Sequence, residues 1–443
     1  MVRHLRSIRR PVLLLLVAAG LLCFTAPFAV AQDHGTGHGE DATGEHADAH
    51  AAEHGDGHGE DHGDGHGAVH ASPVGLLPLW TVIPFVGILL SIALGPLVAP
   101  HFWHAHFPKV SAFWALVFAV PFLFWNTSEA IQEILHIYLM DYIPFIILLW
   151  GLFTISGGIY LGGSLRASPK VNLVLLLIGT FLASLIGTTG AAMVLIRPLL
   201  RANDWRRNKV HLIIFFIFLV SNIGGSLTPL GDPPLFLGFL HNVPFFWVTS
   251  GILAEMLLTA GLVLVVFFLV DTYFYRKEEN KPAADPDAVP LHVEGWHNFF
   301  FLMGVMAAVI MSGSVKMFEV PIYSGGSHAV VVPFQNWLKD IIIVVMGILS
   351  LKTTSKILRE KNGFSWFPIK EVVYLFAGIF MTIIPALAIL KAGSAGALAD
   401  LTNAVHGPVR YFWATGVLSS FLDNAPTYLT FFNAALGDLG RVE

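Results

Sequence analysis

The sequence predicts an all-α polytopic membrane protein. Of its 443 residues, 55% are hydrophobic and only 12% are charged, which is about half the charged fraction of an ordinary soluble domain. Several apolar runs approach or exceed the ~20 residues that a bilayer-spanning helix needs. The composition excludes a nucleic-acid-binding protein, because there is no domain-scale basic face.

The first 31 residues predict a signal peptide. The opening MVRHLRSIRR is basic, the apolar run PVLLLLVAAGLLCFTAPF follows, and Ala29-Val30-Ala31 forms a small-x-small cleavage site. Cleavage places residue 32 onward outside the cytoplasm, so we expect an inner-membrane protein with a periplasmic N-terminal tail. The only cysteine, Cys23, lies in this segment, and no disulfide framework is expected.

Residues 32–72 predict a disordered tail rich in His, Asp and Glu, whose glycines and charges prevent a packed core. Histidines recur every fourth residue at His54, His58, His62 and His66. Neutral imidazoles at this density can bind Zn²⁺, Cu²⁺ or Ni²⁺ weakly. A metal-capturing role and a solvated, pH-responsive tail with incidental metal affinity both stay open.

Residues 73–275 predict a first transmembrane repeat with uninterrupted and interrupted segments. The uninterrupted spans are expected at 74–99, 110–126, 142–163 and 245–270, with an amphipathic connecting helix at 128–140. Segment 171–200 is interrupted by IGTTGA, and segment 210–242 by SNIGGSLTPLGDPP. Both flanks of 171–200 are basic, so we interpret it as a re-entrant hairpin with its tip at 187–190; the alternative is a kinked span.

A cytoplasmic linker is expected at 276–295, followed by a second repeat at 296–443. Its helices are predicted at 296–313, 340–351 and 371–391, and a second hairpin at 411–437 contains SSFLDNAP. With the tail outside, alternating spans put most Lys and Arg in the cytoplasm. Nothing like SNIGGSLTPLGDPP follows this hairpin, so we expect the second broken helix to be missing from a C-terminally truncated fragment.

The order of these segments predicts an inverted repeat. Residues 142–200 and 371–437 both run from a span through a short loop to an interrupted hairpin, one starting outside and the other inside. Inverted repeats whose broken segments meet near the midplane are typical of secondary transporters. We therefore expect that fold, with two re-entrant hairpins and broken helices.

The stretch SNIGGSLTPLGDPP places backbone breakers and a carboxylate at membrane depth. Irregular backbone survives there only where protein or a water-filled cavity satisfies its polar groups. Helix-end carbonyls suit Na⁺ and helix-start amides suit an anion. Asp232 is the candidate charged ligand, although it can also cap a helix that begins with two prolines. Neutral oxygens can come from Ser221, Asn222, Ser226 and Thr228.

A second carboxylate, Asp423, stands in the matching part of the other half, followed by Asn424 and the helix breaker Pro426. We expect Asp423 and Asn424 to join the ion site, with a helix cap as the alternative. The hairpin hydroxyls are further candidate ligands, although each can bond to the backbone instead: Thr188, Thr189, Ser419 and Ser420.

Two more polar residues lie in or beside apolar segments. Glu255 is a candidate proton carrier, and a buried, partnered glutamate is the alternative. His211 is interpreted as a boundary residue.

A carboxylate that holds either a proton or a sodium ion can run cation/proton exchange by alternating access, since burial favours its neutral form. The hydrolase and nucleotide motifs HExxH, GxxxxGK[ST] and GxSxG are missing. We therefore expect neither an enzyme nor a cofactor, and expect Na⁺ or Li⁺ and H⁺ as the transported species.

Three motifs in order resemble the NhaD-type sodium/proton antiporters and their citrate-transporter-like relatives in the ion transporter superfamily: TTGAAMVLIRPLLRAN, SNIGGSLTPLGDPPLFLGFL and SSFLDNAPTYLTFF. The resemblance implies an inverted-repeat fold, often dimeric, and sodium efflux driven by proton entry. It places the family's acidic positions on Asp232 and on Asp423 with Asn424. The Ser-Asn-Thr tips of the dicarboxylate carriers are replaced by Ser-Asn-Ile and Asp-Asn-Ala, which favours a cation.

Two alternatives to a Na⁺(Li⁺)/H⁺ antiporter stay open. One is transport of citrate or another carboxylate, or of an arsenite-type oxyanion. The other is a non-transporting metal sensor that uses the His-rich tail, but the loop 271–295 is short for an output domain. In all three cases the expected partners are small ions and the lipid bilayer.

Overall fold

The computed structural model describes residues 73–279, 289–392, 396–399, 405, 407–420 and 422–439. All of them lie in one compact unit, His66–Glu443, and most are helical. Seven of the described helices are long and apolar enough to cross a membrane. The prediction of an all-α polytopic membrane protein is therefore confirmed.

The first described helices form a tight pair and then one long rod. α2 (Ile83–Val98) and α3 (Pro100–Trp125) are separated by Ala99 alone and pack against each other. α4 (Thr127–Ile137), a π-helical segment (Tyr138–Tyr142) and α5 (Ile143–Ser156) then run on without a break. The expected separation into a connecting helix at 128–140 and a span at 142–163 was wrong, because a π turn joins the two segments and α5 ends at Ser156.

The interrupted segments of the first half are helices joined by irregular backbone. α6 (Pro169–Ile186) and α7 (Thr188–Ala202) pack against each other across Gly187. α8 (Val210–Phe216) runs through a π-helical segment (Ile217–Asn222) into an irregular stretch, and α9 (Pro233–Leu240) follows. The side chain of Ser168 caps α6 by accepting the Val171 N–H at 3.3 Å. α10 is Trp247–Arg276.

The second half contributes six further described helices: α11 (Asn298–Ser314), α12 (Phe334–Thr353), α13 (Lys356–Lys361), α14 (Phe367–Lys391), α16 (Pro408–Ser419) and α17 (Asn424–Leu439). Two small antiparallel sheets were not predicted. β1 (Tyr160–Gly162) pairs with β2 (His292–Glu294), and β3 (Glu319–Tyr323) pairs with β4 (Val330–Pro333).

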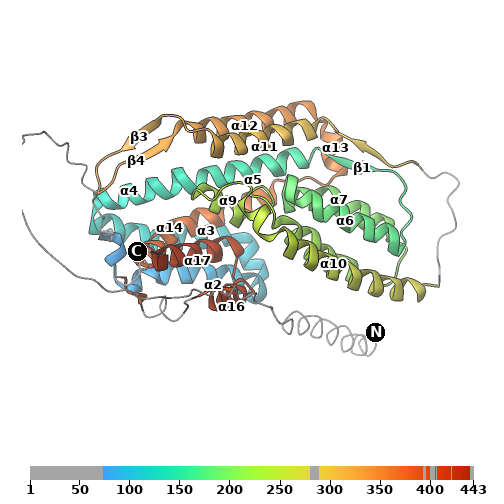
Figure 1. Ribbon diagram of the computed structural model, residues 1–443, viewed down its shortest axis with the longest axis horizontal. Coiled ribbons are helices and arrows are strands. Elements are labelled where there is room, and N and C mark those ends of the chain that lie inside the picture. The colour runs from blue at the N-terminus through green and yellow to red at the C-terminus, as the bar shows by residue number, and fades with distance from the viewer. Residues whose placement is uncertain are drawn as a thin grey trace, which may run out of the picture. The chain divides into compact units, whose positions relative to one another are not determined.

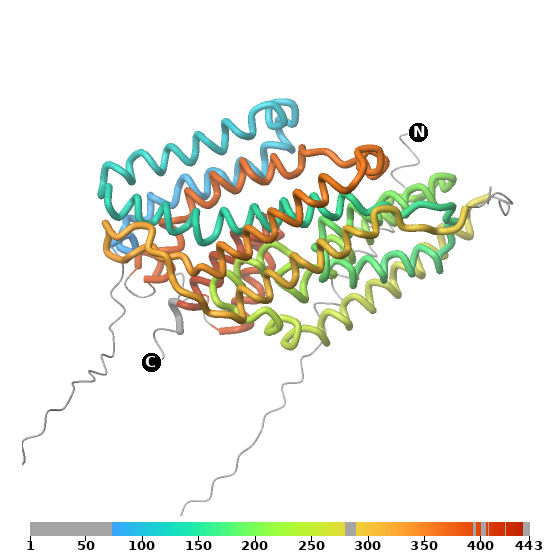
Figure 2. The backbone as a smooth tube through the Cα atoms, turned by 90° about the horizontal axis from the view of Figure 1, so that it is seen from above, coloured from blue at the N-terminus to red at the C-terminus, as the bar shows by residue number. Residues whose placement is uncertain are grey.

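The helix formed by α4 and α5 and the helix α14 lie at the centre of this unit. α5 contacts α7, α9, α11, α12 and α14, and Figure 1 shows the α11–α12 pair lying along the rod of α4 and α5. α14 packs beside α3 (Figure 2) and against α17. By contrast, most of α10 is exposed, as expected of a helix that faces lipid.

A buried polar network joins four segments that the sequence keeps apart. The Asp271 carboxylate of α10 pairs with the Arg206 guanidinium at 2.6 Å and with the His211 ring at 2.8 Å. Asn172 of α6 donates to the same carboxylate at 2.9 Å and exchanges amide hydrogen bonds with Asn203. His211 is thus a buried partner of Asp271, while its interpretation as a boundary residue of the membrane stays a prediction.

We expect replacement of Arg206 by Gln to lower the free energy of unfolding by about 3–5 kcal/mol, because it leaves a buried carboxylate without its guanidinium. Thermal unfolding of the purified protein in detergent measures the effect. The control is Lys209→Gln, which breaks the exposed Lys209–Asp204 pair and should change stability by less than about 1 kcal/mol. Equal losses in the two variants would contradict a structural role for the buried network.

Candidate functional site

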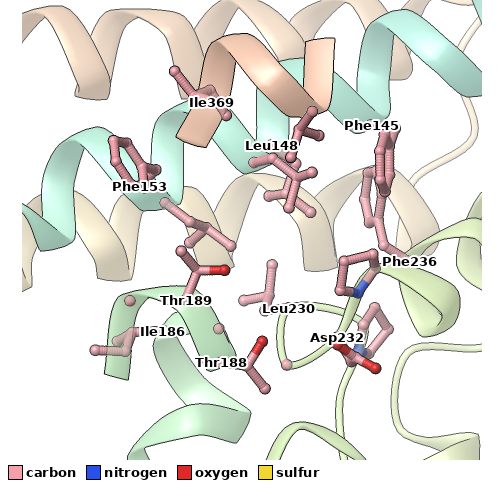
Figure 3. A pocket seen from close by; sticks show the side chains of 18 of the residues that line it. Phe145, Leu148, Phe153, Ile186, Thr188, Thr189, Leu230, Asp232, Phe236 and Ile369 are labelled. Carbon is pink, nitrogen blue, oxygen red and sulfur yellow. The ribbon is translucent and has the colours of Figure 1, made fainter. Parts of the chain in front are cut away.

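A cavity of about 140 Å³ lies between the first hairpin, the irregular stretch before α9, and the helices α5 and α14. Thr188, Thr189 and Asp232 line it, together with the backbone around Gly231. In Figure 3, Thr188 and Asp232 come from different elements and lie on the same side, while Phe145 of α5 lies across from them. The structure thus brings three of the predicted ligands into one space.

The hairpin tip is built on a residue that needs glycine. Gly187 ends α6 with a φ of +80°, a conformation that a side chain disfavours. The chain turns there and α7 begins at Thr188, whose N–H donates to the Gly231 carbonyl at 2.9 Å. The backbone of the tip is therefore bonded directly to the irregular stretch.

The irregular stretch itself folds so tightly that its glycines cannot carry side chains. A Cβ on Gly231 would lie 2.1 Å from the Gly225 carbonyl oxygen, and a Cβ on Gly225 would lie 2.5 Å from the Thr188 methyl. Thr249 of α10 also donates to the Leu227 carbonyl at 2.5 Å. These contacts fix the backbone that presents Asp232.

Asp232 occupies the N-cap position of α9, as the helix-cap interpretation expected, but its side chain makes no capping hydrogen bond. Pro233 and Pro234 follow and have no N–H to offer. The carboxylate is therefore not used to cap α9, and it lines the cavity instead.

Asp423 precedes α17 and does cap it, since its Oδ1 accepts the Ala425 N–H at 2.9 Å. The Asp423 side chain is exposed, and it lies near enough to Asp232 for the two charges to interact. α9 and α17 pack together, with the Tyr428 hydroxyl filling the space beside Gly238. Two carboxylates from opposite halves of the chain thus stand at the starts of two neighbouring helices.

Most of the other predicted oxygens are engaged elsewhere. The Thr228 hydroxyl donates to the Ser184 carbonyl, and the Ser420 hydroxyl donates to the Gly416 carbonyl at 2.8 Å. The Asn424 side chain accepts from Ser419. Asn222 is exposed and donates to the Ile217 carbonyl at 2.8 Å. Like Ser221, none of these side chains lines the cavity.

Two other sets of predicted residues are not among the described residues that line the cavity. Glu255 lies on the exposed face of α10, so a role in proton transfer stays a prediction. His54, His58, His62 and His66 lie outside the described residues. Among the residues that are described, no three His, Cys, Asp or Glu side chains are grouped as a metal site.

Sequence reasoning missed the apolar walls of the cavity and one charge beside them. Phe145 and Leu148 of α5, Ile369 of α14 and Phe236 of α9 line the space. The ring face of Phe236 also packs on the ammonium of Lys339 in α12, with Nζ 5.3 Å from the ring centroid. Lys339 is 0% exposed, and its charged neighbour is Asp340 at 3.4 Å. The only sequence feature that could have indicated a role for Lys339 was its position beside an apolar run.

We expect Gly231→Ala to destabilise the protein by about 1–3 kcal/mol, because the added methyl forces the irregular stretch apart. The control is Gly251→Ala on α10, where a Cβ would meet nothing within 4 Å and a helix interior favours alanine. Thermal unfolding of both variants in detergent provides the comparison. Equal stability of the two variants would show that the close backbone approach at Gly231 does not contribute to the stability of the protein.

A family model described as "Putative citrate transport" matches residues 75–443. No curated protein and no solved structure matches the chain. The matched region includes both hairpins, the irregular stretch and the two carboxylates. The chain therefore belongs to this family of secondary transporters, which the family model describes as "Putative citrate transport".

Proposed function

We propose that this transporter exchanges Na⁺ or Li⁺ for protons at the cavity, by alternating access. The observation that carries the proposal is the charge of the cavity lining. Among the described residues that line the cavity, Asp232 is the one with an ionisable side chain. A carboxylate in an otherwise apolar space attracts a monovalent cation and repels an anionic substrate. The hydroxyls of Thr188 and Thr189 add neutral oxygens.

The nearby carboxylate of Asp423 supports the same reading. When both groups are ionised, their charges repel each other, and a proton or a cation bound between them relieves that repulsion. Since one bound cation or one bound proton is enough, the two compete. This competition couples outward movement of one to inward movement of the other if the site opens to one side at a time.

The family description favours a second candidate, a carboxylate substrate such as citrate. The start of α7 at the cavity could offer first-turn amides to an anion. The start of α9 offers fewer, because its first two residues are prolines and a carboxylate already stands there. The geometry around Asp232 therefore favours the cation over the carboxylate.

The proposed setting is the inner membrane, with the N-terminal tail in the periplasm. The predicted signal peptide and the excess of Lys and Arg on the opposite side support this orientation. It places the β3–β4 hairpin and the C-terminal end of α9 on the outer side.

Everted vesicles with an inside-acid proton gradient test the proposal. We expect added Na⁺ or Li⁺ to dissipate the gradient, as followed with a pH-sensitive dye, and K⁺ and citrate to have little effect. Asp232→Asn and Asp423→Asn should each reduce the rate by more than about tenfold, because each removes a charge that the bound cation requires.

The matched control is Asp204→Asn, which makes the same change at an exposed carboxylate of a surface ion pair and should leave the rate unchanged. Gradient-driven citrate accumulation without any response to Na⁺ or Li⁺ would sink the antiport proposal and support the carboxylate candidate. Full activity in both site variants would show that neither aspartate binds the transported ion.

A further inference from the structure

A buried carboxylate lies in the long helix, outside the cavity. Asp141 is 3% exposed. In the described part of the chain, its one ion-pair partner is His241, whose Nδ1 lies 3.7 Å from Asp141 Oδ1. That distance is too long for a hydrogen bond. The His241 side chain is 19% exposed, against 4% for that of Asp141, so the histidine is the member of the pair that reaches the molecular surface.

The backbone at Asp141 has an unusual form that the neighbouring helix holds in place. Tyr138–Tyr142 is a π-helical turn inside a continuous helix, a feature that often marks functional sites. The Tyr138 hydroxyl donates to the Ala377 carbonyl at 2.7 Å, and the Tyr142 hydroxyl donates to the Val373 carbonyl at 2.9 Å. Both acceptors belong to α14, so the π turn is anchored at its two ends, while Asp141 faces His241.

His241 ends the short helix that begins at Asp232. It is the C-cap residue of α9, and its Nδ1 lies 2.9 Å from the Leu237 carbonyl oxygen. Its ring packs edge-on against Phe432 of α17 at 5.8 Å. The eight residues of α9 measure about 12 Å. A change in how His241 is held therefore acts on a short rod whose other end carries the candidate transport carboxylate.

The charges around the pair favour an added proton. Lys391 of α14 interacts with Asp141, with His136 and with Glu133. His241 also interacts with His136, and Glu129 and His328 interact with Glu133. While the histidines are neutral, three carboxylates face one ammonium, and a proton offsets part of the excess negative charge.

We propose that Asp141 and His241 form a second proton-binding site, and that a proton held there keeps α9 docked on the π turn. The proton passes from water to Nε2 of the imidazole, because Nδ1–H already donates to the Leu237 carbonyl, and the resulting imidazolium attracts the Asp141 carboxylate. When the proton leaves, a buried carboxylate faces a neutral ring and the attraction is lost. The proposal rests on the proposed function only in treating Asp232 as the transport site.

Hydrogen exchange of the full chain in detergent tests the proposal without requiring transport. We expect amides in α9, after correction for intrinsic exchange rates, to be protected about tenfold less at pH ~8 than at pH ~5.5, because loss of the proton removes the attraction that keeps α9 docked on the π turn. Asp141→Asn and His241→Gln should both remove this dependence. His101→Gln, at an exposed position of α3, should retain it.

Protection of α9 that is independent of pH in the unmodified protein would overturn the proposal. So would a pH dependence that persists in either pair variant. Since His241→Gln changes the partly exposed partner, it provides the answer if Asp141→Asn does not fold. Vesicles without cation exchange but with a pH-responsive α9 would remove the antiport function and leave this site standing. Normal antiport together with pH-independent protection of the α9 amides would support the antiport function and exclude this second proton site.

Discussion

The hydrogen bonds between the first hairpin and the irregular stretch hold the centre of this protein together. The Ser184 hydroxyl donates to the Gly224 carbonyl at 2.5 Å, and the Ser184 carbonyl in turn accepts from Thr228. The Thr188 N–H donates to the Gly231 carbonyl. Without water, each unpaired backbone group at membrane depth costs several kcal/mol. The cavity exists because the two irregular segments satisfy each other.

This mutual dependence explains which parts of the site were predictable. Asp232, Thr188 and Thr189 stand out in the sequence because helix breakers and polar groups are rare in apolar segments, and their only stable location is beside one another. Phe145 and Ile369 do not stand out, because a wall of the cavity and a lipid-facing surface have the same composition. Likewise, the hydroxyls of Thr228 and Ser420 were predicted by type, but their hydrogen bonds depend on local geometry that the sequence does not show.

The long helix and the buried network show a second limit. The apolar segments located α4 and the start of α5. They did not give the end of α5, and they could not show that a π turn joins the two helices, because the turn depends on tyrosine hydroxyls reaching α14. Similarly, Asn172 and Asp271 are bonded although 99 residues separate them. Only an alignment or a structure can pair such residues, whereas the all-α polytopic class follows from hydrophobicity alone.

Phe236 contacts the cavity on one side and carries the buried ammonium of Lys339 on its ring face. One aromatic side chain is thus shared by the negative and the positive parts of the protein interior. A smaller residue at this position would remove that shield and let the ammonium act on the cavity. The size of the side chain at position 236 therefore sets how far the positive charge of Lys339 is screened from the cavity that Asp232 lines.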